Sequence, residues 1–171
     1  MKLKTLKRRM AHYLVNHILS GTRFFSAKRR LLRSCGYEIG EGTKIVGPLF
    51  CTGALRIGHD CWIGRNLAIE GNGSVIIGNC CDIAPGVTFF TGGHRIGSAG
   101  RRAGKGESYQ ITVGNGVWIG GRATILRSAH IGDGSVIAAC ACVVGDIPRS
   151  VLAAGVPAKP VKELDENAAE D

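Results

Sequence analysis

The stretch VGNGVWIGGRATILRSAHIGDGSVIAACAC, Val113 to Cys142, decides the fold because it repeats every six residues. The first residue of each unit is aliphatic and often precedes glycine, and the fifth residue is small or apolar. A period of six fits neither an amphipathic helix nor a simple alternating hairpin. It fits a solenoid of short strands, in which the first residue points into a shared core and the fifth packs near a corner.

Similar units run from Ile39 to Pro148 and are broken in two places. The unit IEGNGSVI, residues 69–76, has two extra residues. The segment TGGHRIGSAGRRAGKG, Thr91 to Gly106, does not follow the repeat and introduces a histidine into a basic, glycine-rich stretch. We therefore expect the loop 94–110 to project from the solenoid, and buried Cys61 and Cys81 to act as small core residues.

Composition limits the class of protein. The chain of 171 residues suits one domain, and its 26 glycines without collagen spacing indicate many tight turns. The seven cysteines are an odd number and include the adjacent pair Cys80 and Cys81, which argues against a disulfide framework and for a reducing compartment. With no apolar run of about 20 residues and no cleavable signal peptide, the sequence predicts a cytoplasmic protein.

The units resemble the hexapeptide-repeat acyltransferases, whose fold is a left-handed parallel β-helix. Three segments carry the resemblance in the expected order. IAPGVTFFTGGH, residues 83–94, is similar to the segment that ends in the catalytic histidine of the galactoside and maltose O-acetyltransferases. ITVGNGVWIGGRATIL, residues 111–126, is similar to their strand segment with a tryptophan beside the acetyl-CoA channel. GSVIAACACVVGDIPRSVLAAGVPAKPVK, residues 134–162, is similar to their cofactor-binding end.

The resemblance implies an acetyl-CoA-dependent O-acetyltransferase, active as a homotrimer with each site between two solenoids. His94 is the implied general base, since imidazole is the side chain whose ordinary pKa lies near neutrality. It takes a proton from an acceptor hydroxyl, the oxygen attacks the acetyl-CoA thioester, and backbone N–H groups stabilise the oxyanion. The alternative is an exposed histidine without a function.

The resemblance also assigns residues to the cosubstrate. Trp118 matches the channel tryptophan, and an exposed tryptophan on a solenoid face usually binds a ligand. Backbone groups match the pantetheine contacts at Gly121 and Ala139. Two lysines match basic residues near the adenine and 3′-phosphate end, Lys159 and Lys162. Where relatives often have Thr-Lys before Asp-Ile-Pro, this chain has Val144 and Gly145, so one polar and one charged contact are replaced.

The acceptor site is predicted to differ from that of galactoside enzymes. Asn72 falls where they place a sugar-contacting aspartate, and their binding asparagine falls on Gly64, two residues before Asn66. The candidate acceptor residues are Asn66, Glu70, Asn72 and Glu107, although both asparagines also suit turns. Glu107, in the GESY stretch, is a candidate for orienting His94 or the substrate. Three loop bases meet either an anionic acceptor, the CoA phosphates or solvent: Arg101, Arg102 and Lys105.

No metal site is expected, because His59 and His130 occupy outward positions and no second histidine follows His94 at metal-ligand spacing. The acceptor is expected to be a sugar hydroxyl in a cell-surface polysaccharide or its precursor. The alternatives are an amino sugar, serine or antibiotic acceptor, or a non-catalytic structural or membrane-binding solenoid. Nucleic-acid binding has no supporting motif.

The first segment, residues 1–36, is set apart by charge. Residues 1–34 contain ten Lys and Arg and no acid, although the net charge of the whole chain is only +9. Apolar residues recur at helical spacing at Leu3, Leu6, Met10, Tyr13, Leu14 and Ile18. This segment resembles the N-terminal extension of bacterial polysaccharide O-acetyltransferases. It predicts either a helix capping the solenoid or peripheral contact of residues 1–34 with the cytoplasmic face of a membrane.

Two further segments complete the predicted organisation. Residues 37–150 are predicted to form the β-helix, and residues 151–171 a CoA-binding segment followed by an acidic tail, which is either a short helix or disordered.

Overall fold

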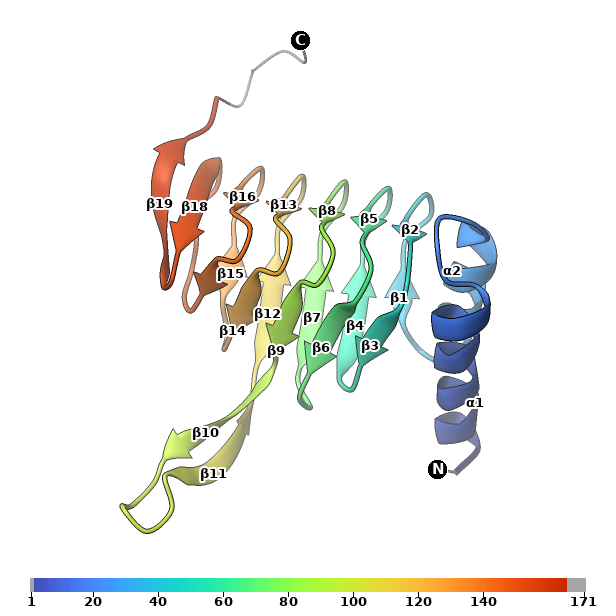
Figure 1. The fold of residues 1–171 in the computed structure, drawn as a ribbon, viewed down its shortest axis with the longest axis horizontal. Coiled ribbons are helices and arrows are strands. Elements are labelled where there is room, and N and C mark those ends of the chain that lie inside the picture. The colour runs from blue at the N-terminus through green and yellow to red at the C-terminus, as the bar shows by residue number, and fades with distance from the viewer. Residues whose placement is uncertain (1, 166–171) are drawn as a thin grey trace.

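The computed structural model describes residues 2–165, and the side chains from Leu6 onward. Two α-helices come first, α1 (Lys2–Tyr13) and α2 (Phe25–Ser34), with a π-helical turn, η1 (Leu14–Ile18), after α1. A stack of triangular coils follows, and one hairpin projects far from the stack (Figure 1).

Three parallel sheets form the sides of the triangular stack. Sheet A contains β1 (Glu38–Ile39), β4 (Ala54–Ile57), β7 (Ser74–Ile77), β12 (Gln110–Val113) and β15 (His130–Ile131). Sheet B contains β2 (Lys44–Ile45), β5 (Trp62–Ile63), β8 (Asp82–Ile83), β13 (Trp118–Ile119), β16 (Val136–Ile137) and β18 (Val151–Gly155), with β19 (Ala158–Glu163) antiparallel at its edge. Sheet C contains β3 (Leu49–Cys51), β6 (Leu67–Glu70), β9 (Thr88–Phe90), β14 (Thr124–Leu126) and β17 (Cys142–Val143).

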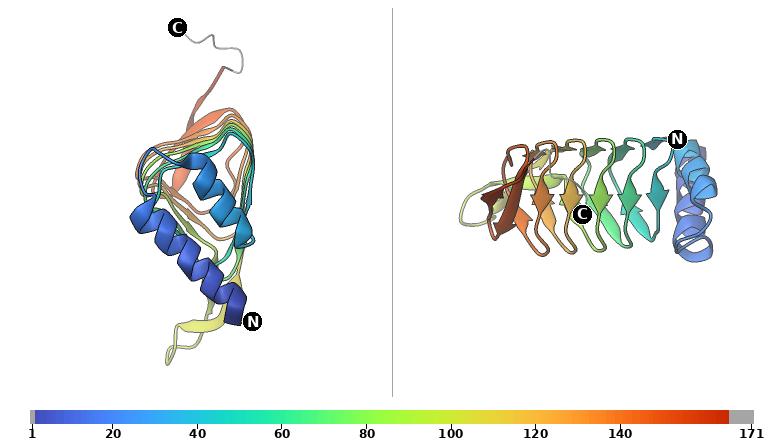
Figure 2. Two further views of the ribbon diagram at one scale, coloured as in Figure 1. Left: turned by 90° about the vertical axis from the view of Figure 1, so that its right-hand side faces the viewer. Right: turned by 90° about the horizontal axis from the view of Figure 1, so that it is seen from above.

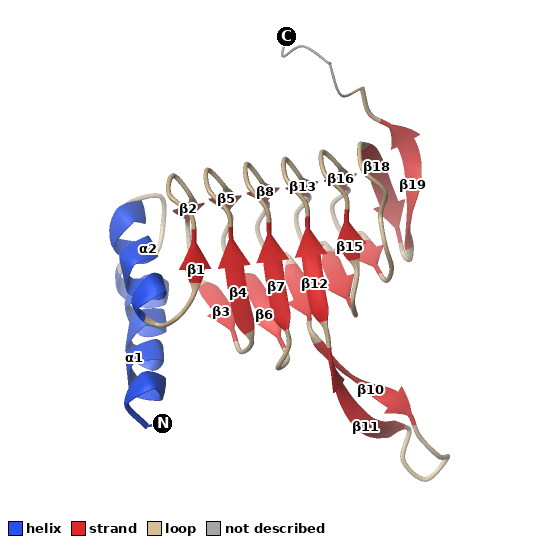
Figure 3. Cartoon of the chain, turned by 180° about the vertical axis from the view of Figure 1, so that it is seen from behind, coloured by secondary structure: helices blue, strands red, loops and turns tan. Residues whose placement is uncertain are grey.

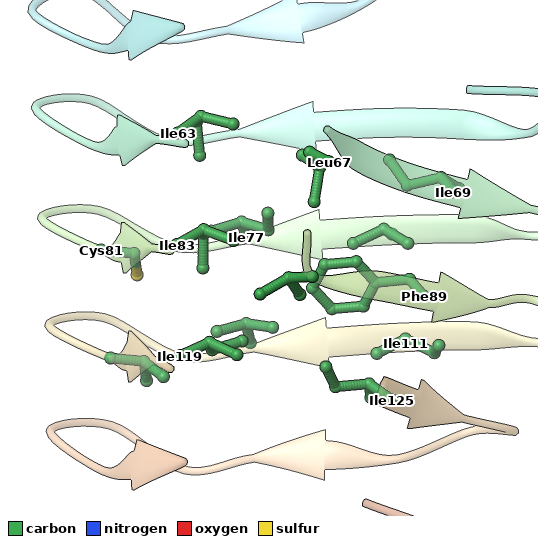
Figure 4. Packing of buried hydrophobic residues seen from close by; sticks show 14 of the residues in the cluster. Ile63, Leu67, Ile69, Ile77, Cys81, Ile83, Phe89, Ile111, Ile119 and Ile125 are labelled. Atoms are coloured by element: carbon green, nitrogen blue, oxygen red, sulfur yellow. The ribbon is translucent and has the colours of Figure 1, made fainter. Parts of the chain in front are cut away.

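The strand register confirms the repeat of six. Ile39 lies beside Ile57, and Ile119 beside Ile137, so one coil is three hexads long. First-position residues such as Ile63, Ile83 and Ile119 are fully buried and stack in rows inside the prism (Figure 4). The fold is the predicted left-handed parallel β-helix.

Fifth-position residues are also buried, including both cysteines predicted to be core residues. The Cys61 thiol donates a hydrogen bond to the Gly78 carbonyl, and the Cys81 thiol donates one to the Gly114 carbonyl. The sulfur–oxygen distance is 3.1 Å in both. These sulfurs therefore fill the corner of the core and bond to the next coil.

Both breaks in the repeat lie at the corner between sheets C and A. The two extra residues follow β6, and the extruded loop follows β9, which is directly adjacent to β6. The loop is a β-hairpin of β10 (Gly92–Ile96) and β11 (Ala103–Ser108), which projects downward from the stack below β12 in Figure 3. Its tip residues, including Arg101, Arg102 and Lys105, are exposed.

The two helices cover the end of the stack where the first coil begins (Figure 2). An uncovered first coil would present backbone groups with no neighbouring coil to pair with. The Lys28 ammonium donates three hydrogen bonds to carbonyls, those of Gly21 (2.5 Å), Ile45 (2.8 Å) and Val46 (3.0 Å). Lys28 is fully buried, and burial lowers its pKa.

Helix α1 makes similar contacts with the polar side of its surface. The Arg8 guanidinium donates to the carbonyls of Cys51 (2.6 Å) and Gly53 (3.0 Å). In the π-helical turn η1 that follows, the Asn16 amide both donates to the Leu49 carbonyl (3.0 Å) and accepts from the Leu49 N–H (2.9 Å). Helix α1 therefore pairs with the first coil mainly through polar side chains.

The helical cap was expected, but the face of α1 that forms it was not. Leu6, Met10 and Tyr13 define the apolar side of the helix, and all three are exposed. Ala11 and Val15 are the buried apolar residues of this segment. The carbonyls at the open end require donors, so the donor-bearing face of α1 packs on the coil and the apolar face points away.

The C-terminal end differs from the helix or disorder that we expected from Lys162 onward. Lys162 and Glu163 belong to β19, which pairs antiparallel with β18. The remainder of the predicted acidic tail, residues 166–171, lies outside the described residues. Across the described part of the chain, no helix is both long and apolar enough to cross a bilayer.

We predict that Lys28→Met lowers the free energy of unfolding by about 2–4 kcal/mol, because buried carbonyls lose their donor. Urea denaturation measures the change. The control is Arg30→Met on the same helix, whose exposed side chain should leave stability within about 0.5 kcal/mol. Equal stability of the two variants would contradict the assigned role of Lys28.

Candidate active site

The hairpin is attached to the solenoid through Thr91, which is fully buried. Its hydroxyl donates to the Glu70 carbonyl (3.0 Å) and accepts from the Gly73 N–H (3.2 Å). The Thr91 carbonyl accepts from the Tyr109 N–H (2.7 Å), where the chain rejoins the stack. One residue thus fixes the base of the hairpin to the two-residue insertion in the preceding coil.

Gly71 allows that insertion to approach the hairpin closely. Its φ is +106°, and a Cβ atom built there would lie 2.4 Å from the Gly92 nitrogen. Only glycine fits both the conformation and the space. The neighbouring residues Glu70 and Asn72 are therefore held against the strand that carries His94.

His94 lies on β10, opposite Gly106 on β11. Its Nδ1 is 2.9 Å from the Gly104 carbonyl oxygen. A carbonyl only accepts hydrogen bonds, so Nδ1 carries the proton in this contact and the lone pair is on Nε2. The imidazole is exposed, and its orientation is set by the backbone of the opposing strand.

Glu107 is next to His94 across the hairpin but binds other groups. Its carboxylate accepts from the Arg95 guanidinium and from the Tyr109 hydroxyl (2.9 Å). Arg95 first, and Tyr109 second, hold the pKa of Glu107 below its ordinary value. The group that orients His94 through Nδ1 is therefore the Gly104 carbonyl, whereas Glu107 forms an ion pair with Arg95.

An open cavity of about 520 Å³ collects most of the residues predicted to meet the acceptor. His94, Glu70, Asn72 and Glu107 all line it, together with the exposed ring of Phe90. Asn66 lies instead at another corner, in left-handed conformation (φ 58°), with its N–H donating to the Pro48 carbonyl (2.8 Å). This places Asn66 in a turn.

A second group of predicted residues lies on the outer face of sheet B. Trp118 is 56% exposed and pairs with Val136 on the next strand. Val136 in turn pairs with Leu152, and Leu152 pairs with Lys162 at the edge of the sheet. These four form one row across adjacent strands. Trp118 and Lys162 are three strands apart, on the order of 15 Å.

The other residues predicted to meet the cosubstrate flank this row. Lys159 lies on β19 with Lys162, and it pairs with Ala154 on the neighbouring strand β18. Gly121 and Ala139 occupy stacked corners of successive coils, since the Gly121 carbonyl accepts from the Cys140 N–H (2.9 Å). Val144 and Gly145 follow β17 and are exposed.

The acceptor cavity and the sheet B row lie on different sides of one chain. The hairpin leaves the corner between sheets C and A, and sheet B forms the side of the prism opposite that corner. In Figure 1 the sheet B strands run along the upper edge and the hairpin projects downward. One chain therefore presents the two halves of the predicted site on opposite faces.

Several residues that shape the site were not found from the sequence. No periodic pattern singles out four of them: Phe90, Thr91, Arg95 and Gly104. Gly104 in addition acts through its backbone carbonyl, which the residue type does not reveal. Tyr109 belongs to the GESY stretch, which was a detectable signal, but only its glutamate was selected. The hairpin register that brings these residues together depends on a turn of irregular length.

The remaining outward histidines have local partners. His59 Nδ1 lies 2.9 Å from an Asp60 carboxylate oxygen, and His130 Nδ1 lies 2.7 Å from the Thr112 hydroxyl. Within the described residues, no cluster of three or more His, Cys, Asp or Glu has metal-binding geometry.

Comparison with known proteins agrees with the fold. The family model for bacterial transferase hexapeptide (six repeats) matches residues 110–145. Galactoside O-acetyltransferase from Escherichia coli (strain K12) is 33% identical over 165 residues, covering 95% of this chain and 80% of the relative.

Two solved structures are similar over almost the whole chain. A hexapeptide-repeat acetyltransferase from Vibrio cholerae, solved with acetyl coenzyme A, is 25% identical with a TM-score of 0.84, covering 96% of this chain and 89% of that one. A galactoside acetyltransferase solved with coenzyme A is 30% identical with a TM-score of 0.81, covering 96% and 82%.

A left-handed β-helix built of hexads is the fold of the hexapeptide-repeat acyltransferases. The extent of identity to the Escherichia coli relative places the chain within this class. The chain belongs to the hexapeptide-repeat acetyltransferases and is an acetyl-CoA-dependent O-acetyltransferase of the galactoside and maltose O-acetyltransferase type.

We predict that Arg95→Ala raises the pKa of Glu107, because the charged carboxylate loses its main donor. Protonation of Glu107 then begins at a higher pH than in the wild type, and carboxyl ¹³C NMR titration measures this shift. Arg102→Ala is the control, since Arg102 donates to the Gly97 carbonyl on the same hairpin. An unchanged titration in Arg95→Ala would exclude the ion pair in solution.

Proposed function

We propose that this enzyme transfers the acetyl group of acetyl-CoA to a sugar hydroxyl of a cell-surface polysaccharide or its precursor, with His94 as general base. The observation that carries the proposal is the imidazole of His94, which is held at Nδ1 by the Gly104 carbonyl and belongs to a residue that lines an open cavity.

His94 moves one proton twice in this mechanism. Nε2 accepts the proton of the acceptor hydroxyl as its oxygen bonds to the thioester carbonyl carbon. When the carbon–sulfur bond breaks, the same proton passes from Nε2 to the CoA sulfur. The products are the acetyl ester and free CoA, and His94 returns to its starting state.

The cavity supports a sugar acceptor. Carboxylates and amides such as those of Glu70, Asn72 and Glu107 accept or donate hydrogen bonds to hydroxyl groups, and Phe90 offers an aromatic surface to a sugar ring. The cavity is open, so a sugar inside a longer chain can enter. Asn72 and Gly64 differ from the galactoside enzymes, which supports a different acceptor.

The sheet B row fits an elongated cosubstrate. Trp118 supplies an exposed apolar surface for the pantetheine arm, and Lys159 and Lys162 supply point charges for phosphates at the far end. Gly121 and Ala139 flank the row with backbone groups. Val144 and Gly145 supply neither a polar nor a charged side chain there.

A homotrimer joins the two halves of the site. Since His94 and Trp118 lie on opposite sides of one prism, we propose that the hairpin of one chain reaches sheet B of its neighbour. The loop bases Arg101, Arg102 and Lys105 then lie near that neighbour or its bound CoA. The seven free cysteines support a cytoplasmic location.

Replacing His94 with Ala is predicted to lower acetyl transfer by about a thousandfold, the scale of losing a general base. Thiol release from acetyl-CoA, measured over a panel of polysaccharides, simple sugars, amino sugars, serine and antibiotics, reports both activity and acceptor class. His59→Ala is the matched control and should keep wild-type turnover.

Three results would overturn the proposal. Turnover retained by His94→Ala would exclude the general base. Thiol release with serine, an amino sugar or an antibiotic only would replace the acceptor class, and none with any acceptor would favour the non-catalytic solenoid.

Trp118→Ala is predicted to weaken CoA binding about tenfold, because an aromatic contact surface is lost. Isothermal titration calorimetry with CoA measures the dissociation constant. Trp62→Ala is the control, since Trp62 lies in the same outward row two coils away and packs against Phe25. Equal affinity in both variants would move the cosubstrate away from Trp118.

A further inference from the structure

Five large apolar side chains are exposed together on the helical cap, each more than half accessible to solvent. We call this surface the cap stripe; it consists of Leu6, Met10, Tyr13, Ile18 and Phe24. Exposed apolar side chains that share one face of a helix mark an interaction site. The acetyl-transfer site does not use it.

Helix geometry aligns the first three residues of the cap stripe. Leu6, Met10 and Tyr13 are spaced four and three residues apart, so they share one face of α1. The π turn extends that face, because the Leu19 N–H donates to the Leu14 carbonyl (2.8 Å), five residues back. Tyr13 and Ile18 are also five residues apart and therefore remain on one side.

Phe24 completes the stripe at the turn before α2. Its φ of +57° lies in the left-handed region, which a bulky side chain rarely adopts. The ring is nevertheless outside the core and exposed. Both helices thus contribute apolar surface to the same end of the molecule (Figure 2).

Basic residues surround the stripe, and the segment contains no acid. Residues 1–34 hold ten Lys and Arg and no Asp or Glu. Four of these cations bond to the first coil or to Glu41 and belong to the cap itself: Arg8, Lys28, Arg29 and Arg33. Four others are exposed on the same two helices or on the segment that joins them: Lys7, Arg9, Arg23 and Arg30.

We propose that the cap stripe binds the surface of a bilayer that contains anionic lipid. Leu6, Met10, Tyr13, Ile18 and Phe24 enter the interfacial region, and the surrounding cations meet lipid phosphates. Charge favours this occupant over a second copy of the chain, because two such caps face to face would bring like charges together.

The fold gives this docking a defined orientation. The cap closes one end of the stack, so the solenoid axis stands away from the membrane (Figure 2). The hairpin follows β9 in the third coil, two strand spacings or about 10 Å from the first coil. His94 is then held close to the bilayer and projects sideways, parallel to its surface.

Co-sedimentation with vesicles tests the apolar part. The full chain is mixed with vesicles of phosphatidylcholine alone or of phosphatidylcholine with phosphatidylglycerol. Binding is expected with the mixed vesicles, and the triple variant Leu6→Ser/Met10→Ser/Tyr13→Ser is expected to bind at least about a hundredfold more weakly. Val156→Ser/Val161→Ser, exposed apolar residues at the opposite end of the chain, should bind like the wild type.

A charge variant tests the electrostatic part. Arg9→Gln should weaken binding to the mixed vesicles about fivefold, and Arg65→Gln, exposed on the solenoid, should not change it. Thermal unfolding confirms that each variant is folded, and acetyl transfer, which the stripe does not contact, reports the catalytic site separately.

Three outcomes would overturn the proposal: no binding of the wild type to mixed vesicles, equal binding by the triple variant, or equal binding to phosphatidylcholine alone. A fall in mass of the triple variant in sedimentation equilibrium would also overturn it, by assigning the stripe to contacts between copies.

Discussion

The cross-section of the prism is the constraint on which the rest of the structure depends. Each coil hydrogen-bonds to the next, and every inward position must meet its counterpart in the neighbouring coil, as Ile63 meets Ile83. A coil therefore cannot lengthen without pushing residues outward. Both insertions in this chain leave at one corner, and Thr91 and Gly71 lock them together. The candidate catalytic residue His94 and the cavity beside it lie at this corner because insertions here do not disturb the repeat.

The first coil faces a different constraint, since it has no preceding coil to pair with. Lys28 and Arg8 supply the missing donors, and this requirement determines which side of α1 packs inward. Leaving these buried carbonyls without a hydrogen-bond donor costs more free energy than exposing the apolar side chains of α1 to water. The apolar side of α1 consequently points outward. A cap made of donors thus creates a second surface, with chemistry unlike that of the acyltransfer site.

The six-residue period, with its first and fifth positions buried, made a solenoid of short strands predictable from the sequence, whereas the left hand of the β-helix came from the resemblance to the hexapeptide-repeat acyltransferases. His94 and Trp118 were reachable through their segments, and Glu70, Asn72 and Glu107 meet at one cavity. Contacts made by backbone atoms were out of reach, as with the Gly104 carbonyl on His94. The inward face of α1 was not predicted for a related reason. Helical periodicity identifies an apolar face, but it does not show whether the surface that the helix packs against requires apolar groups or hydrogen-bond donors.

The opposite placement of His94 and Trp118 follows from the same prism. A corner and the side facing it cannot meet within one chain, however the loops change. The proposed site, which combines the His94 imidazole at a corner with the Trp118 row on the opposite side, therefore requires two copies of the chain. Sequence changes between related chains therefore have different structural consequences in two parts of the molecule. The inward residues and the sheet B row are tied to the shared register, whereas the corner insertions carrying Asn72 and Glu107 can change length and side chains without disturbing it. Acceptor preference is then free to diverge while the cosubstrate row stays in place.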